Sequence, residues 1–182
     1  MLVNKQMNVT PLFLDFEASS LASASYPIEV AWSYADNSVE SHLISPTGVT
    51  TWTDWSIAAQ RLHGLSREQL LTDGRPPTWV ARRMNEQLAG QLLYSDNPDY
   101  DGFWLEELFK KSAGLKPAFS LLHIEELLIS LLCSENSDRV HALSRIKTMK
   151  QIARREVVGQ HRAGLDVKYL LALYALAKAE NG

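Results

Sequence analysis

Two carboxylates stand two residues apart in a short apolar stretch near the start of the chain, LFLDFEA at 12–18. In an extended strand, alternate side chains point to the same face, so Asp15 and Glu17 project together, a few ångströms apart. Unpaired carboxylates on a half-buried strand repel each other and lose hydration, and this stretch contains no lysine or arginine to offset them. A hard divalent cation with oxygen ligands suits such a pair. The pair alone equally fits an exposed strand face with two solvated acids.

A third carboxylate follows a short apolar strand in the segment SDNPDYDGFWLEEL, which begins at residue 95. Asp101 stands where a helix is expected to begin, and we favour it over the flanking Asp96 and Asp99 for that reason. Asn97 is expected to cap this helix, with a contact to substrate as the alternative.

A histidine and a fourth carboxylate lie around the start of the last expected helix, in GQHRAGLDVKYLL at 159–171. His161 and Asp166 are five residues apart. A single histidine at such a position is usually a helix cap, so this segment gains weight only together with the other two.

In this order, the three segments resemble the three motifs of the DEDDh 3′→5′ exonucleases, the RNase T-like branch of enzymes with the ribonuclease H-like fold. The motifs D-x-E, N-x-x-(F/Y)-D and H-x-A-x-x-D match DFE at 15–17, NPDYD at 97–101 and HRAGLD at 161–166. LHGLS at 62–66 looks like a segment that many of these enzymes carry between the first and second motifs. The resemblance covers residues 11–171, nearly the whole chain.

The resemblance implies a pair of Mg²⁺ or Mn²⁺ ions as cofactor, with His161 taking the proton from the attacking water. The implied metal ligands, which count as catalytic together with His161, are Asp15, Glu17, Asp101 and Asp166. It also implies a site for the terminal nucleotide, to which we assign Phe16, Ala18, Ser19, Leu21, His63 and Asn97. For His63, a structural hydrogen bond within its loop is an equal alternative.

The chain departs from the family pattern at two places. It reads ASSL at 18–21 where the family usually continues T-T-G-L, and the serine in place of glycine affects the fit of the terminal nucleotide. Gly164 replaces a bulkier residue in the third motif and removes no ligand.

Composition and length predict one α/β domain over residues 1–182. A net charge of −3 gives no overall basic footprint, which argues against a protein that coats nucleic acid by charge alone. The first 13 residues lack the features of a secretory signal, and no stretch approaches the ~20 apolar residues that span a bilayer. With a single cysteine, Cys133, these features predict a cytoplasmic protein with no membrane partner.

The expected elements form a mixed sheet flanked by helices, with three antiparallel strands followed by parallel ones, as in the ribonuclease H-like fold. Strands are expected at 11–17, 27–35, 39–45, 91–96 and 117–124. Helices are expected at 54–60 after a Thr53/Asp54 cap, at 66–71 with a capping box from Ser66 to Gln69, and at 78–90, 102–114, 125–132, 138–155 and 162–179.

Two surface features are candidates for contacts with nucleic acid. Lys147, Lys150 and Arg154 share one face of the expected helix and fit either a phosphate track or a solvated face. Trp52 and Trp55 lie in a connection, where they are candidates for stacking on bases.

We therefore expect a metal-dependent 3′→5′ exonuclease that acts on single-stranded RNA or DNA ends and releases nucleoside monophosphates. One alternative is trimming of short RNA by the same chemistry. Others are a non-catalytic nucleic-acid-binding or protein-binding module on the same fold, and an endonuclease of the ribonuclease H type. The sequence leaves the preferred sugar open, as well as the choice between monomer and homodimer.

Overall fold

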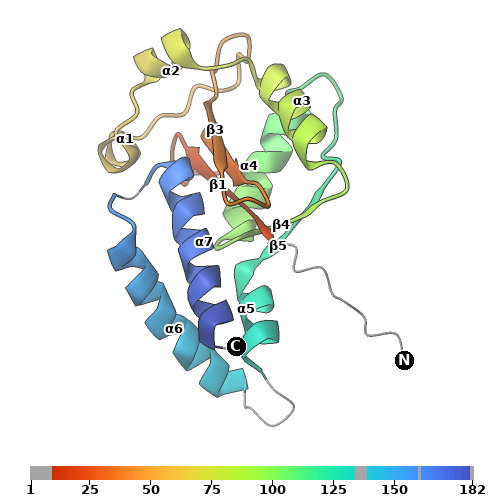
Figure 1. Ribbon diagram of the computed structural model, residues 1–182. Coiled ribbons are helices and arrows are strands. Elements are labelled where there is room, and N and C mark those ends of the chain that lie inside the picture. Colours follow the sequence, from red (N-terminus) through yellow and green to blue (C-terminus); the bar gives the residue numbers. More distant parts are fainter. Residues whose placement is uncertain (1–9, 134–138, 160, 181–182) are drawn as a thin grey trace.

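The strand that carries the first acidic pair is the central strand of a five-stranded sheet with the order β3-β2-β1-β4-β5 (Figure 1). β1 (Leu12–Ala18) pairs antiparallel with β2 (Pro27–Ser33), which pairs antiparallel with β3 (Val39–Leu43). On its other side β1 pairs in parallel with β4 (Leu92–Ser95), and β4 pairs in parallel with β5 (Ser120–His123). The predicted mixed sheet is confirmed.

The computed structural model describes residues 10–133, 139–159 and 161–180, so the expectations for residues 1–9 and 138 lie outside it. The helices in these residues are α1 (Ile57–His63), α2 (Arg67–Asp73), α3 (Pro77–Leu88), α4 (Pro98–Lys110), α5 (Ile124–Leu132), α6 (Arg139–Glu156) and α7 (Ala163–Glu180). None of those helices is both long and apolar enough to cross a membrane.

Helices cover both faces of the sheet, and the alternation of side chains along β1 divides the core accordingly. Leu14 and Phe16 belong to the larger buried cluster, which includes residues of α3 and α4. Phe13 points the other way, into a second cluster with residues of α5, α6 and α7. Asp15 and Glu17 share the face of Phe13, so they point toward the side on which α7 lies (Figure 1).

Two of the three predicted caps differ from expectation. The capping residue of α2 is confirmed, because the hydroxyl of Ser66 accepts the N–H of Gln69 at 3.1 Å. The Thr53/Asp54 cap of α1 was wrong, since the helix begins at Ile57 and its cap is Ser56. The Asp54 carboxylate instead accepts hydrogen bonds from the hydroxyls of Ser19 and Ser20 at the end of β1, at 2.9 and 2.6 Å.

The helix expected from residue 102 begins at Pro98, and Asn97 occupies its cap position without a side-chain hydrogen bond to the helix. The expected side-chain cap was therefore wrong. Pro98 supplies the first turn without an N–H, and the Asn97 carbonyl accepts the N–H of Asp101 at 3.0 Å. Asp101 consequently lies inside the first turn of α4.

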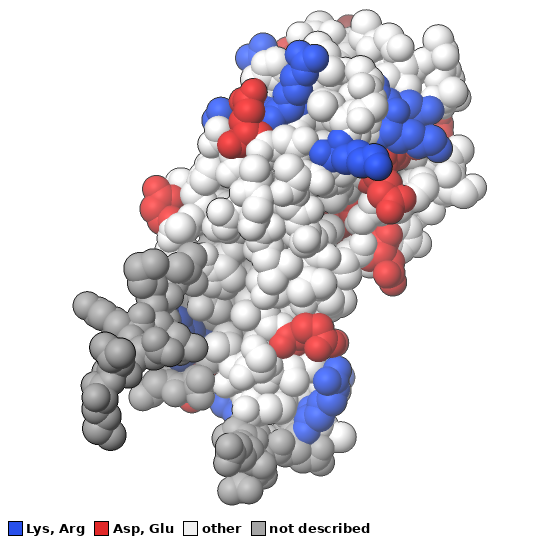
Figure 2. All heavy atoms as spheres, turned by 90° about the vertical axis from the view of Figure 1, so that its right-hand side faces the viewer, with Lys and Arg blue, Asp and Glu red and all other residues white. Residues whose placement is uncertain are grey.

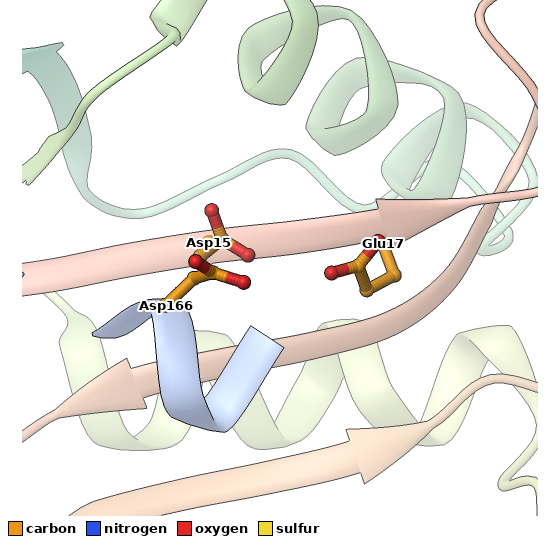
Figure 3. A group of neighbouring side chains, drawn as sticks. All are labelled: Asp15, Glu17 and Asp166. Atoms are coloured by element: carbon orange, nitrogen blue, oxygen red, sulfur yellow. The ribbon is translucent and has the colours of Figure 1, made fainter. Parts of the chain in front are cut away.

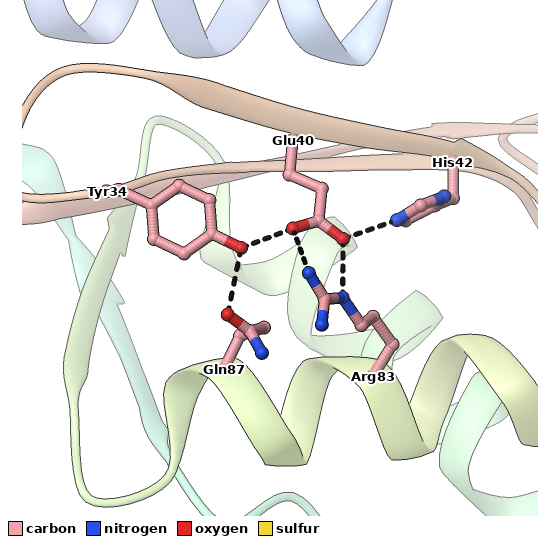
Figure 4. A network of polar contacts seen from close by, with 5 residues as sticks. All are labelled: Tyr34, Glu40, His42, Arg83 and Gln87. Atoms are coloured by element: carbon pink, nitrogen blue, oxygen red, sulfur yellow. Dashed lines mark hydrogen bonds and ion pairs between the residues drawn. The ribbon is translucent and has the colours of Figure 1, made fainter.

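A polar network ties the edge strand β3 to α3 (Figure 4). Arg83 donates two hydrogen bonds to the Glu40 carboxylate, at 2.7 and 3.0 Å. His42 contacts the same carboxylate at 2.7 Å, and the Tyr34 hydroxyl donates to it and lies 3.2 Å from the Gln87 side-chain oxygen. Burial alone would raise the pKa of Glu40, but the hydrogen bonds outweigh it and hold that pKa at about 2. On the right-hand side of the molecule as drawn in Figure 1, positive and negative side chains are interspersed over the upper part of the surface (Figure 2).

We predict that Glu40→Gln lowers the free energy of unfolding at pH 7 by roughly 1.5–3 kcal/mol, the usual range for hydrogen bonds to a charged group. The pKa of Glu40 is lower in the folded protein than its ordinary value of 4.5. The ionised carboxylate therefore stabilises the fold fully when the pH is above 4.5, and this stabilisation is lost as the pH falls toward about 2. The difference between wild type and variant in urea unfolding should therefore shrink below pH 4.5. Glu106→Gln, an exposed acid on α4, should change little at either pH. A constant difference from pH 7 to pH 3 would contradict this account.

Candidate active site

Carboxylates from β1, the end of β4, α4 and α7 converge on one place, and Asp15 lies at its centre. Asp15, Glu17 and Asp166 form one group in which one oxygen of each residue lies within 4.8 Å of the others. Asp15, Asp96 and Asp101 form a second group with the same spacing. Figure 3 shows Asp166, at the start of α7, directed toward β1 and its two acids.

The pairing of β1 with β4 accounts for the second group. The parallel register sets Leu12 opposite Leu93 and Phe13 opposite Tyr94, and continuing it by two residues brings Asp96 level with Asp15. The short connection into α4 then turns Asp101 back toward β1. Its Oδ1 accepts the backbone N–H of Phe16 at 3.3 Å, which joins the start of α4 to the central strand.

The second oxygen of Asp101 has no hydrogen-bond partner in the described part of the chain, although the side chain is 2% exposed. Burying a carboxylate oxygen without a partner costs free energy. Either a ligand supplies the missing partner, or the fold bears this cost. Asp99, the competing candidate, is exposed and belongs to neither group. Asp101 as a metal ligand stays a prediction from the sequence.

Crowding and burial disfavour charge on these acids. Burial, reinforced by Asp101, Asp166, Glu17 and Asp96, raises the pKa of Asp15 well above its ordinary value. Burial and then Asp166 raise the pKa of Glu17 to about 8, and burial raises that of Asp101 to about 7. The site therefore favours protons or cations over bare carboxylates.

The donor set fits hard divalent cations. It consists of carboxylate oxygens alone, which Mg²⁺ and Mn²⁺ accept, and it lacks the thiolate and imidazole ligands that favour softer metals. The unpartnered oxygen of Asp101 is the most specific sign of fit, because a bound cation would give that buried atom its missing partner.

The third motif is anchored by an ion pair between Arg162 and Glu29 of β2. Arg162 donates to both oxygens of Glu29, at 2.9 and 3.0 Å, and the N–H of Ala163 donates to the same carboxylate at 3.1 Å. Glu29 lies opposite Glu17 in the β1–β2 register and is 2% exposed. This clamp holds the first turn of α7, and with it Asp166, against the sheet.

His161 precedes this clamp in a turn of unusual backbone conformation. Its φ is 58°, in the left-handed region that non-glycine residues seldom adopt, though histidine does so more readily than most. Its ring has no hydrogen-bond partner among the described residues and belongs to neither carboxylate group. His161 thus precedes the first turn of α7, and no side-chain cap by its ring is found among the described residues.

Gly159 allows the chain to turn between α6 and His161. Its φ of 98° is open to glycine, and a Cβ there would approach the Leu165 side chain to 2.8 Å. A side chain at this position would therefore disturb the entry into α7.

Among the residues assigned to the terminal nucleotide, some are exposed and others are buried. Leu21 is 71% exposed and lines a mostly apolar cavity of about 360 Å³ with Tyr100 and Phe103 of α4. Phe16 and Ala18 are buried. The Phe16 ring packs in the cluster on the far face of the sheet from the carboxylates.

The hydroxyl of Ser19 is engaged internally, because it donates to Asp54 and accepts the N–H of Tyr26 at 3.1 Å. Asn97 is exposed at the entrance of α4. His63 is 4% exposed and its Nδ1 accepts the N–H of Leu65 at 3.0 Å, which is the structural alternative expected for it. Its other ring nitrogen is buried without a partner in the described residues.

Most of the residues expected to contact nucleic acid at the surface, on α6 and in the connection before α1, make contacts within the protein instead. Trp52 is 2% exposed, stacks on Tyr26 and donates to Glu107, so its assignment to base stacking was wrong. Lys150 lies 3.7 Å from Glu125, and Arg154 turns into the carboxylate site. The basic face of α6 is therefore only partly a solvated stripe.

Two site residues were missed or ranked too low from the sequence. Glu29 interrupts PIEVAWS, a strand whose residues are all buried, and such a charge in an apolar run was a visible signal of a partner. Asp96 was set aside in favour of Asp101, yet both belong to the second group. The strand end that brings Asp96 to Asp15 is a feature of strand pairing, which spacing along the chain does not show.

We predict that Arg162→Met destabilises the fold more than Glu29→Gln does. Removing the arginine leaves a buried carboxylate unpaired, at a cost of about 3–5 kcal/mol, whereas the Arg162 side chain is 41% exposed and reaches water when Glu29 is lost. Urea unfolding of both variants and of the double variant measures the order and the coupling between the residues. Equal effects, or a smaller effect of Arg162→Met, would contradict the clamp.

We also predict that the protein in EDTA becomes less stable as the pH rises from 5 to 8. Folded Glu17, with a pKa of about 8, and Asp101, with a pKa of about 7, hold protons that the unfolded chain releases near its ordinary values of 4.5 and 3.8. The folded state therefore binds more protons in this interval, so stability is greatest below it and is lost as the pH rises. Thermal unfolding across the interval should show this fall, with a smaller fall for Glu17→Gln and an unchanged one for Glu106→Gln. Parallel curves for all three proteins would exclude the explanation.

Comparison with known proteins supports the fold. No protein-family model matches the chain, and no curated protein matches it. Among solved structures, the zinc-bound complex of E. coli exonuclease I with single-stranded DNA has a TM-score of 0.63 at 16% identity, covering 92% of this chain and 39% of that one.

Two other structures of that exonuclease are similar to the chain. Its complex with a dA16 oligonucleotide has a TM-score of 0.60 at 17% identity over 92% of this chain and 39% of that one. Its apo form has a TM-score of 0.62 at 15% identity over 92% and 41%. The chain thus spans about two fifths of the length of those exonuclease chains. The likeness confirms the predicted α/β, ribonuclease H-like fold.

Proposed function

We propose that the chain is a metal-dependent 3′→5′ exonuclease domain of the DEDDh type. It hydrolyses phosphodiester bonds at the 3′ end of single-stranded nucleic acid and releases nucleoside monophosphates. The observation that carries this proposal is that Asp15, Glu17, Asp101 and Asp166, from three separated motifs, fall into two groups of neighbouring carboxylates that share Asp15. The single-stranded DNA bound by exonuclease I, which shares the fold, supports the class of substrate.

The carboxylates divide into the ligands of two cations, Mg²⁺ or Mn²⁺. Asp15 belongs to both groups and would contribute to holding both cations. Glu17 and Asp166 complete one site, and Asp101 completes the other with Asp96 beside it. When bound, such a pair supplies the charge that stabilises the attacking and leaving oxygens of the phosphodiester.

His161 accepts the proton of the attacking water in this proposal. Imidazole is the side chain that enzymes use most often as a general base. The clamp between Arg162 and Glu29 keeps the backbone next to His161 fixed, while the ring itself remains free of internal hydrogen bonds in the described residues. A ring placed in this way can turn toward a bound substrate.

The apolar cavity beside α4 receives the terminal base. Leu21, Tyr100 and Phe103 offer apolar and aromatic surface there, on which any base can stack. Because this surface reads the face of the base and not the sugar, it is compatible with RNA and with DNA. Trimming of short RNA and formation of a homodimer stay predictions from the sequence.

A binding module without catalysis is the main alternative. Burial, and then repulsion by neighbouring carboxylates, raises the pKa of Asp15. A binding module would gain nothing from holding carboxylates that repel one another in this way. An endonuclease of the ribonuclease H type remains distinct, because it would cut circular strands, on which an exonuclease has no end to start.

The test uses 5′-labelled single-stranded RNA and DNA, linear and circular, with Mn²⁺ or with EDTA. The wild type should shorten linear strands from the 3′ end with Mn²⁺ only. Asp15→Ala should lose activity by orders of magnitude together with Mn²⁺ binding, whereas His161→Ala should lose roughly 10²–10⁴-fold in turnover and keep Mn²⁺ binding. Glu106→Gln, an exposed acid on α4 that belongs to neither carboxylate group, serves as the control. Mn²⁺ binding without any cleavage would favour the binding module, and cleavage of circles would favour the endonuclease.

A further inference from the structure

A guanidinium group already occupies part of the carboxylate site. Arg154, near the end of α6, donates a hydrogen bond from Nη1 to Oδ1 of Asp166 at 2.5 Å. Its Nη2 lies 3.7 Å from Oδ2 of Asp96. Asp166 and Asp96 belong to different groups of the site, so one side chain contacts a member of each.

The guanidinium is held in this position by more than its charge. Its central carbon lies 3.6 Å from the centre of the Tyr169 ring, in a cation–π contact. Tyr169 is 2% exposed and follows Asp166 by one turn of α7. The Arg154 side chain is 37% exposed, so it also has a way out of the site.

Lys150 and Arg155 show that this contact is specific to Arg154. Lys150, one turn earlier on α6, pairs with Glu125 at 3.7 Å. Arg155, the next residue, is exposed and makes no hydrogen bond or ion pair within the described residues. Among the cations near the end of α6, Arg154 is therefore the one that meets the metal-ligating acids directly.

We propose that Arg154 is a resident counter-cation of the metal site. It neutralises and positions Asp166 and Asp96 while the site holds no metal, and it competes with the divalent cations for those carboxylates. The inference rests on the proposed function, because it takes Asp166 as a metal ligand. Arg154 is a positioning residue in this sense, since it acts through the acids.

The competition follows from geometry and charge. A guanidinium N–H at 2.5 Å uses one lone pair of the Asp166 carboxylate, which leaves fewer of them open to a metal ion. A fixed positive charge beside the two groups also repels a cation in either of them. Arginine stays protonated around neutral pH, so it does not leave this competition by losing its charge.

The experiment is titration of Mn²⁺ into the metal-free full chain by calorimetry, combined with thermal unfolding in EDTA. Arg154→Met keeps the length and apolar contact of the side chain but removes the charge. We expect it to bind Mn²⁺ about tenfold more tightly than the wild type and to unfold at a lower temperature in EDTA. Arg155→Met, the matched control, should resemble the wild type in both measurements.

Arg154→Lys provides a second variant in case the methionine variant does not fold without metal. It keeps the charge but replaces the planar fork by a single ammonium, so its Mn²⁺ affinity should lie between those of the wild type and Arg154→Met. Equal or weaker Mn²⁺ binding by both variants, with the wild type binding normally, would overturn the inference and leave the metal site of the proposed function intact. Absence of Mn²⁺ binding in every protein would overturn both. Tighter binding by the variants without any 3′ trimming by the wild type would support the inference and remove the exonuclease.

Discussion

Mutual repulsion of buried carboxylates around Asp15 is the constraint on which the rest of the site depends. Burial and four neighbouring acids all raise the pKa of Asp15, so the cluster is stable only with protons, internal cations or bound metal. A fold that keeps this cluster together must hold the acids by contacts outside the cluster itself. The contacts of the surrounding elements hold the acids in this way.

The helices that carry Asp101 and Asp166 are each tied to the sheet, α4 to the central strand β1 and α7 to its neighbour β2. The N–H of Phe16 fixes Asp101 and with it the start of α4. On the opposite face, Glu29 of β2 holds Arg162 and the first turn of α7, so that Asp166 meets β1 from the other side. Arg154 supplies a positive charge from a third direction. These contacts hold the framework of the site through the protein's own residues.

The faces of β1 and the cap of α2 could be predicted because strand alternation and that cap depend on neighbouring residues. The alternation in LFLDFEA set Asp15 and Glu17 on one face, and the capping residue Ser66 is found as expected. Local patterns failed where a tertiary partner competed for the same side chain. Asp54 was expected at a helix cap but accepts the hydroxyls of Ser19 and Ser20, and Trp52 was expected at the surface but stacks on Tyr26 in the core.

The sequence by itself determined which acids are available and that Asp15 and Glu17 lie on one strand face, since this depends on a period of two residues. Tertiary structure alone decided which of them meet. Asp96 joins Asp15 through the parallel pairing of β1 with β4, and Glu29 reaches Arg162 across 133 positions of sequence. Arg154 lies on the predicted basic face of its helix, but its place against Asp166 depends on how α6 packs beside α7. Such contacts join residues far apart in the chain, and no local periodicity records them.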